Sequence, residues 1–236
     1  MTEESKTLVL AIPIFNGITV LDAVGPYECL HVLPNVKVVF VSHQAGPYKA
    51  TLGYLSLSAT HSFDEVPHPD IIVVPGGPGI MLLLDDKPFL DWIRKAHETS
   101  MYTTSVCSGS LMLGAAGLLK GLTAATHWNV YDILESYGAK PTADRVVQEG
   151  KILTAAGVSS GIDMGLKLVS LITDEKTAKS VQLLLEYDPQ PPFDTGCLKK
   201  AAAEPDVIER AKSIGYRLRA HAIDNHGNHV GEMVFS

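Results

Sequence analysis

One cysteine of this chain lies where a nucleophile is expected to be exposed and activated. Cys107 stands between a β-branched run, 101–106, and a segment with helical spacing, 108–119, so the pattern places it at a strand-to-helix junction. Ser108 and Gly109 directly after it allow a tight backbone turn, as in a nucleophile elbow with cysteine in place of serine. The N-terminus of the following helix is expected to lower the pKa of the thiol and to favour the thiolate. The alternative is a free cysteine that serves as a small buried hydrophobe.

A glycine-rich turn follows a second apolar run. The stretch "VVPGGPG" (73–79) places Gly76 and Gly77 after a strand, where glycine lets a backbone N–H approach a ligand closely. The N–H groups of Gly77 and Ser108 are expected to form a donor pair like an oxyanion hole. The same stretch is also typical of an ordinary turn. It lacks the Lys-Ser or Lys-Thr pair of a phosphate-binding loop.

Two further residues could exchange protons near the thiol. Asp22, in "VLDAVGP" (20–26), follows the first apolar run, and a carboxyl beside a thiol either accepts its proton or donates one to the thiolate. Desolvation and a nearby thiolate would both raise the pKa of this carboxyl, whereas an N-cap is the alternative role for Asp22. His127, near the end of the short apolar run 124–128, is a candidate base in a Cys–His pair or a structural residue.

The elements that must position these residues alternate along the chain. Apolar runs predict strands at 7–15, 36–42, 70–77, 101–106, 124–128 and 151–157, with a hairpin or edge strands within 46–62. Helical spacing predicts helices at 22–33, 87–100, 108–119, 129–138, 159–173 and 174–188. This alternation predicts an α/β protein with a mainly parallel sheet between helices, whose ligand site lies at the carboxyl ends of the strands.

Composition and charge narrow the class of protein. The chain of 236 residues is 46% hydrophobic and 19% charged, which is typical of a soluble globular protein. Its net charge of −7, without a basic patch in the composition, argues against nucleic acid as a partner. No apolar run reaches the roughly 18 residues of a membrane helix, and the first residues do not resemble a signal peptide. Cys29, Cys107 and Cys197 are an odd number at scattered spacing, which favours reduced thiols and a cytoplasmic location.

The pattern changes at a proline-rich stretch near the end of the chain. "DPQPPFDTG" (188–196) interrupts the alternation, and a modest helical segment, 204–223, follows it. We therefore expect one domain, 1–196, and a C-terminal extension, 197–236, packed on that domain or on a dimer partner. The three histidines of the polar tail, His221, His226 and His229, do not have the spacing of a firm metal site.

Four stretches together resemble a known family. "VLDAVGPYECL", "IIVVPGGPG", "TSVCSGSLMLGAAGLLKGLTAATHW" and "LLLEYDPQPPF" resemble the PfpI superfamily of cysteine α/β proteins, and within it the isonitrile hydratases, from about residue 7 to about residue 196. The resemblance implies a flavodoxin-like three-layer sandwich, commonly a homodimer, with Cys107 as the reactive cysteine and Asp22 as the acidic residue that contacts it. Ser108 stands where the hydratases carry threonine, which keeps the hydroxyl, and Pro78 stands where a small polar residue is expected.

The resemblance also implies a chemistry. Cys107 would attack the carbon of a small-molecule isonitrile to give a thioimidate, with Asp22 as general acid and then base. Ser108 would hold the substrate or the Asp22 carboxyl, and Gly76, Gly77 and His127 would contact the substrate. No metal or organic cofactor is required. The alternatives are another activity of the superfamily, namely a glyoxalase, deglycase or peptidase, or a redox sensor in which Cys107 is oxidised. A DNA-binding regulator fits least, because the residues after about 190 show no helix-turn-helix pattern.

Overall fold

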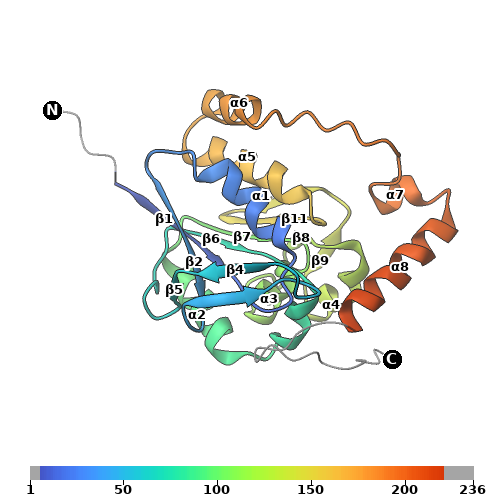
Figure 1. Cartoon of the computed structure of the whole chain (residues 1–236), viewed down its shortest axis with the longest axis horizontal. Helices are drawn as coiled ribbons and strands as arrows, with labels where there is room; N and C mark the ends of the chain where they lie inside the picture. The colour runs from blue at the N-terminus through green and yellow to red at the C-terminus, as the bar shows by residue number, and fades with distance from the viewer. Residues whose placement is uncertain (1–5, 221–236) are drawn as a thin grey trace.

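A seven-stranded sheet forms the centre of the computed structural model, which describes residues 6–220 of the chain (Figure 1). Its strands are β1 (Leu8–Pro13), β2 (Val36–Ser42), β5 (His61–Ser62), β6 (Ile71–Val74), β7 (Tyr102–Val106), β10 (Val146–Glu149) and β11 (Ile152–Ala155). They lie in the order β10-β11-β7-β6-β1-β2-β5. Neighbouring strands are parallel, except for the antiparallel pair of β10 and β11 at one edge. The predicted mainly parallel sheet is therefore confirmed.

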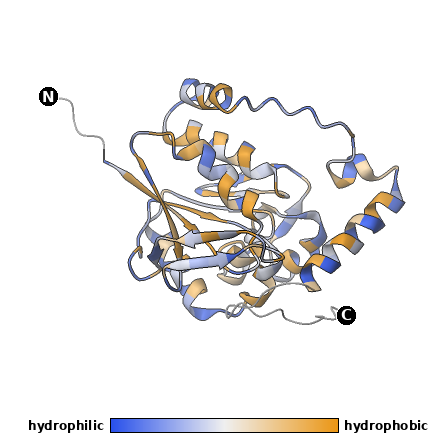
Figure 2. Ribbon diagram, in the orientation of Figure 1, coloured by the Kyte–Doolittle hydropathy of each residue, from blue (hydrophilic) through white to orange (hydrophobic). Residues whose placement is uncertain are grey.

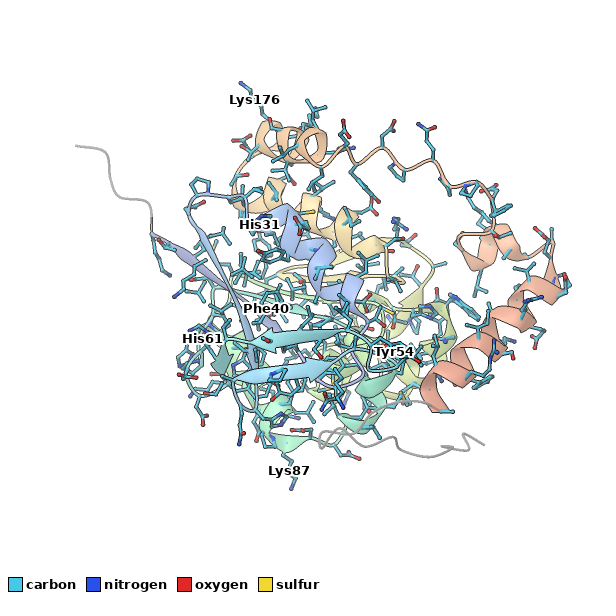
Figure 3. All side chains as sticks on the ribbon, in the orientation of Figure 1. His31, Phe40, Tyr54, His61, Lys87 and Lys176 are labelled. Atoms are coloured by element: carbon cyan, nitrogen blue, oxygen red, sulfur yellow. The ribbon has the colours of Figure 1, made fainter. Side chains whose placement is uncertain are left out.

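Helices cover both faces of this sheet and complete the expected flavodoxin-like three-layer sandwich (Figure 1). One face carries α1 (Val20–Leu30) and α5 (Ser160–Ile172), with α6 (Glu175–Leu184) packed on α5; the other carries α2 (Lys87–Thr99) and α3 (Gly109–Ala115). Lys176 on α6 and Lys87 at the start of α2 mark the two opposite outer surfaces (Figure 3). Because both faces are covered, β6 and β11 are buried along their whole length, and β6 is a continuous apolar run.

Two small sheets and several short helices connect these layers. β3 (Gly46–Lys49) and β4 (Ser56–Ala59) form an antiparallel hairpin, as expected for this region. β8 (Thr123–Ala125) pairs in parallel with β9 (Lys140–Thr142), which the sequence did not predict. The remaining short elements are the 3₁₀ helices η1 (Pro78–Leu82) and η2 (Trp128–Val130) and the helix α4 (Tyr131–Ser136).

Some predicted boundaries were wrong, for identifiable reasons. α3 ends at Ala115 instead of 119, since Gly117 adopts a φ of 85°, which stops a right-handed helix. The strand expected at 124–128 covers only β8. The helix expected at 129–138 is divided into η2 and α4, and Gly138, with a φ of 80°, follows the end of α4. β9 and β10 both lie between residues 139 and 150, where no strand was predicted.

The core lies between the sheet and its helices, where Figure 2 shows apolar colour along the central strands. Under α2, an aromatic cluster joins Phe63, Phe89 and Trp92, with ring centroids 4.9–6.3 Å apart. The indole Nε1–H of Trp92 donates to the carbonyl of Val66 at 2.8 Å, so the buried polar tip of this side chain is satisfied. Trp92 is therefore a packing residue.

The described part of the C-terminal extension returns to the domain. Residues 185–197 leave α6 without a helix or strand and reach α7 (Leu198–Ala201), from which α8 (Pro205–Ala220) runs back toward α4 (Figure 1). α8 contacts η1 of the same chain, and it confirms most of the helix expected at 204–223. His221, His226 and His229 lie outside the described residues. None of the described helices is both long and apolar enough to cross a bilayer.

Candidate active site

The backbone at Cys107 has the strained geometry of a nucleophile elbow. Cys107 follows β7 directly and has a φ of 59°, in the left-handed region that a residue with a Cβ rarely occupies. Its N–H is shared between the carbonyls of Ala155, at 3.1 Å, and Ala156, at 2.9 Å, at the end of β11. Its own carbonyl accepts the hydroxyl of Thr126 at 3.1 Å. These bonds from the neighbouring strands hold the turn that carries the thiol.

Glycine is required beside the elbow because two loops approach each other closely. A Cβ on Gly109 would lie 2.2 Å from the carbonyl oxygen of Val74, and one on Gly76 would lie 2.6 Å from the backbone nitrogen of Ser108. Both distances are far below any real contact, so a side chain at either position would push the β6 and β7 loops apart. The glycine turn after β6 therefore serves to bring its backbone against the elbow.

Asp22 lies under the elbow and does not cap its helix. It sits in the first turn of α1, whose N-cap residue is Thr19, and it is fully buried. Its Oδ2 accepts the N–H of Gly76 at 3.0 Å, while Oδ1 has no hydrogen-bond partner among the described residues. The neighbour that interacts with this carboxyl is the Cys107 thiol, a weak hydrogen-bond donor.

This environment raises the pKa of Asp22 to about 7. Burial is the main cause, because it penalises the charged carboxylate, and it outweighs the hydrogen bonds from Gly76 and Cys107, which favour the charge. A carboxyl with such a pKa exchanges its proton readily near neutral pH, as a general acid and base must.

The pKa of the Cys107 thiol is raised, which corrects the sequence prediction of a lowered value. Burial is again the first cause, and the negative charge of Asp22 is the second. The backbone N–H groups of Ser108 and Val158 interact with the sulfur and favour the thiolate, but they do not compensate for these two effects. In the resting site the Cys107 thiol is therefore protonated, and the Asp22 carboxyl beside it can accept that proton when it is ionised.

Ser108 holds the glycine turn and does not contact Asp22 by any hydrogen bond seen in the described residues. Its Oγ accepts the N–H of Gly77 at 3.0 Å and lies 3.4 Å from the carbonyl oxygen of the same residue. The N–H of Gly77 is thus already bonded, so the expected donor pair of Gly77 and Ser108 is not formed in this structure. The two donors that meet at the sulfur are Ser108 and Val158.

His127 stands at the side of the site. It is the N-cap of η2, where its Nδ1 lies 3.4 Å from the backbone nitrogen of Asn129 and 2.5 Å from Asn129 Oδ1. Burial lowers the pKa of His127; the bond to Asn129 opposes this, and the charge of Arg219 adds to it. His127 is therefore neutral at pH 7, and it is not among the groups that shift the pKa of Cys107. The carboxyl, rather than the imidazole, is the proton partner of the thiol.

A cavity of about 270 Å³ opens in front of the sulfur. Four predicted site residues line it, namely Gly77, Cys107, Ser108 and His127, whereas Asp22 and Gly76 are not part of its lining. Apolar side chains make most of the remaining wall, and the residues that complete it are Thr19, Pro78, Met81, Trp128, Asn129, Val130, Val158, Ala211, Ile214, Gly215, Leu218 and Arg219. The arrangement offers one nucleophile and one buried acid to a small ligand. Within residues 6–220, no cluster of three His, Cys, Asp or Glu side chains is placed to hold a metal ion.

The chain is similar to several known proteins. Residues 9–171 match the DJ-1/PfpI family. The chain belongs to the DJ-1/PfpI family. It is 44% identical over 199 residues to the isonitrile hydratase of Pseudomonas putida, which covers 84% of this chain and 86% of that protein. The crystal structure of a ThiJ/PfpI family protein from Pseudomonas syringae matches with a TM-score of 0.82 and 36% identity, covering 90% of this chain and 89% of that one. The glutathione-independent glyoxalase DJR-1.2 of Caenorhabditis elegans is 25% identical over 112 residues, or 48% of this chain and 60% of that protein.

Two parts of the site in this DJ-1/PfpI protein were missed from the sequence. The first is the N–H of Val158, which follows β11 in the stretch "AAGVSSG" (155–161). Its position at the carboxyl end of a strand was a usable signal, because the other site loops lie at the same edge. The second is the wall contributed by α8, for which the sequence gives an amphipathic helix but no indication of what it covers.

Proposed function

We propose that this DJ-1/PfpI protein is an isonitrile hydratase, which adds water to an isonitrile and releases an N-substituted formamide. The observation that carries the proposal is the interaction of the Cys107 thiol with the buried Asp22 carboxyl, behind a small and mostly apolar cavity. The 44% identity to the hydratase of Pseudomonas putida supports it. An isonitrile carries one reactive carbon and one organic substituent, so a site that hydrates it must supply a nucleophile, a proton donor and an apolar space for the substituent.

The first half of the proposed reaction joins the sulfur to the isonitrile carbon. The Asp22 carboxylate accepts the proton of the Cys107 thiol while the sulfur attacks, so the raised pKa of the thiol does not prevent the step. The protonated Asp22 then delivers the same proton to the isonitrile carbon. A C–S bond and a C–H bond have formed, and the product is a thioimidate on Cys107.

The second half releases the formamide. Water adds to the thioimidate carbon and gives one proton to the Asp22 carboxylate. The hydroxyl proton of the adduct moves to nitrogen, the C=O bond forms, and the C–S bond breaks. The departing thiolate recovers its proton from Asp22, so the thiol and the carboxylate are restored and only water has been consumed. The N–H groups of Ser108 and Val158 stabilise the negative charge on the sulfur whenever it is present.

The remaining site residues support these steps. Gly76 fixes the Asp22 carboxyl through its N–H, and Ser108 fixes the glycine turn through Gly77. Gly77 and His127 form part of the cavity wall that the substrate would contact. In this scheme His127 has no proton to transfer.

Two alternatives are supported less well. A cavity of about 270 Å³ is just below the range of roughly 300–1,000 Å³ for sites that hold drug-sized ligands, so it suits a small molecule better than a peptide. A redox sensor needs a thiolate that oxidises readily, whereas the pKa of Cys107 is raised.

Formamide production from cyclohexyl isocyanide tests the proposal directly. We expect turnover in the wild type and in Cys197→Ala, which removes an exposed thiol far from the elbow in sequence, and none in Cys107→Ala. Wild-type protein with a free Cys107 and no turnover of any isonitrile would overturn the proposal. Turnover of methylglyoxal by the same protein would then favour a glyoxalase.

A further inference from the structure

One face of α8 lines the cavity in front of Cys107. Ala211, Ile214, Gly215 and Leu218 line the cavity, and their spacing of i, i+3, i+4 and i+7 places them in one stripe along the helix. Three of the four are apolar with side chains of different size, and the fourth is glycine. A Cβ on Gly215 would lie 3.3 Å from Asn129 Nδ2, so the helix backbone approaches the floor of the cavity closely at this point.

The neighbouring stripe of α8 faces a different space. A second cavity, of about 370 Å³, lies beside the first and is lined from α8 by Ile208, Lys212 and Tyr216. Trp128, Asn129 and Arg219 border both cavities. Different residues of α8 therefore line the two cavities, so substitutions can alter one cavity without removing a side chain from the other.

The attachment of α8 to the domain is light. None of its described residues is fully buried, and Ile214 remains 43% exposed although it lines the cavity. A hydrogen bond of 3.4 Å from the Arg219 guanidinium to the carbonyl of Asn129 joins its last turn to η2. Truncating a side chain of the cavity stripe is consequently expected to change the cavity without unfolding the domain.

We propose that α8 is the specificity wall of the site: Ile214 and Leu218 receive the substituent of the substrate and set its size. This inference rests on the proposed hydratase function. The isonitrile carbon has to reach the sulfur of Cys107, and this stripe of α8 lines the same small cavity, so a substituent that fills the cavity contacts the stripe. Because the stripe is apolar and the cavity small, the substrates are isonitriles with a compact branched or cyclic hydrocarbon group.

The test compares isonitriles of increasing size. kcat/KM is measured for tert-butyl, cyclohexyl and 1-adamantyl isocyanide with the wild type, Ile214→Ala and Leu218→Ala. Ile208→Ala is the matched control, since it removes an apolar side chain of the same helix from the second cavity. We expect the ratio of kcat/KM for 1-adamantyl isocyanide to kcat/KM for tert-butyl isocyanide to rise about tenfold in Ile214→Ala and Leu218→Ala, because a few methyl groups in an apolar pocket usually have an effect of this size. The same ratio should stay unchanged in Ile208→Ala.

A second readout separates this inference from the function on which it rests. In a Cys197→Ala background, the rate of Cys107 alkylation by N-ethylmaleimide is compared with that by N-cyclohexylmaleimide, with the modified residue identified by mass spectrometry. The same variants are expected to favour the larger reagent. If neither ratio differs between Ile214→Ala, Leu218→Ala and Ile208→Ala, α8 is not the specificity wall. If the alkylation ratio changes but no isonitrile is turned over, α8 does set the size of ligand that reaches Cys107, and the hydratase function is refuted.

Discussion

Replacing Asp22 with asparagine is expected to abolish turnover and, at the same time, to stabilise the fold in alkaline solution. Asparagine has nearly the shape of aspartate, and its side-chain oxygen can still accept the N–H of Gly76. It cannot take or give the proton that the proposed reaction needs, so activity is lost. It also carries no charge, so the cost of burying a carboxylate disappears.

The size of the stability effect follows from the pKa of Asp22. In the unfolded chain this carboxyl ionises near 3.8, whereas in the folded protein it ionises at about 7. A rise of about three pKa units corresponds to about 4 kcal/mol, at 1.36 kcal/mol for each unit. The folded state binds the extra proton between these two values, so the free energy of unfolding falls as the pH rises through them. Above about pH 7 the full cost is present in the wild type.

Urea unfolding of the wild type and Asp22→Asn from pH 4 to pH 8 measures this effect. The stability of the variant relative to the wild type should increase over the range, toward about 4 kcal/mol, while any offset independent of pH reflects the new amide group.

Asp70→Asn is the matched control for that series. Burial tends to raise the pKa of Asp70, but hydrogen bonds from Lys6 and Val9 outweigh it and lower the pKa, so Asp70 is ionised in both states above pH 5. Its stability difference from the wild type should therefore stay flat between pH 5 and pH 8. An Asp22→Asn difference that is equally flat would refute the argument that burial raises the pKa of this carboxyl.

Three further predictions concern the elbow. The rate of Cys107 alkylation by iodoacetamide should rise continuously from pH 6 to pH 9, because the pKa of the thiol is raised; a plateau below pH 7 would contradict this. Ser108→Ala should lower the free energy of unfolding by about 1–3 kcal/mol in urea, since the buried N–H of Gly77 loses its acceptor, and Ser108→Thr should lower it less. Gly109→Ala should prevent soluble folding, whereas Gly117→Ala, with open space around its Cβ, should cost less; equal melting temperatures would disprove the close approach at Gly109.

The central layers of this fold were predictable because their signals are local. Strands covered on both faces, such as β6, appear as continuous apolar runs, and the turn after β7 combines a cysteine with small residues. These two signals placed Cys107 at the carboxyl edge of the sheet, where the structure has it. β9 and β10 are short and only partly buried, so they leave no comparable pattern.

The electrostatics of the site were not predictable in the same way. Gly76, whose N–H donates a hydrogen bond to the Asp22 carboxyl, is 54 residues away in the sequence, so an N-cap was an equally available interpretation of Asp22. The raised pKa of Cys107 results from burial by several separate segments, which no single stretch reveals. The domain boundary at 196, a homodimer and a cytoplasmic location stay predictions.

The position of α8 in the chain has a consequence for synthesis. Every strand of the sheet and the whole elbow precede α8, so a nascent chain can assemble them while residues 205–220 are still within the ribosome. During that interval Cys107 has its strained turn and its acid, but its cavity lacks one side. If α8 is the specificity wall, the Cys107 thiol of the growing protein is expected to accept larger electrophiles than the thiol of the folded protein.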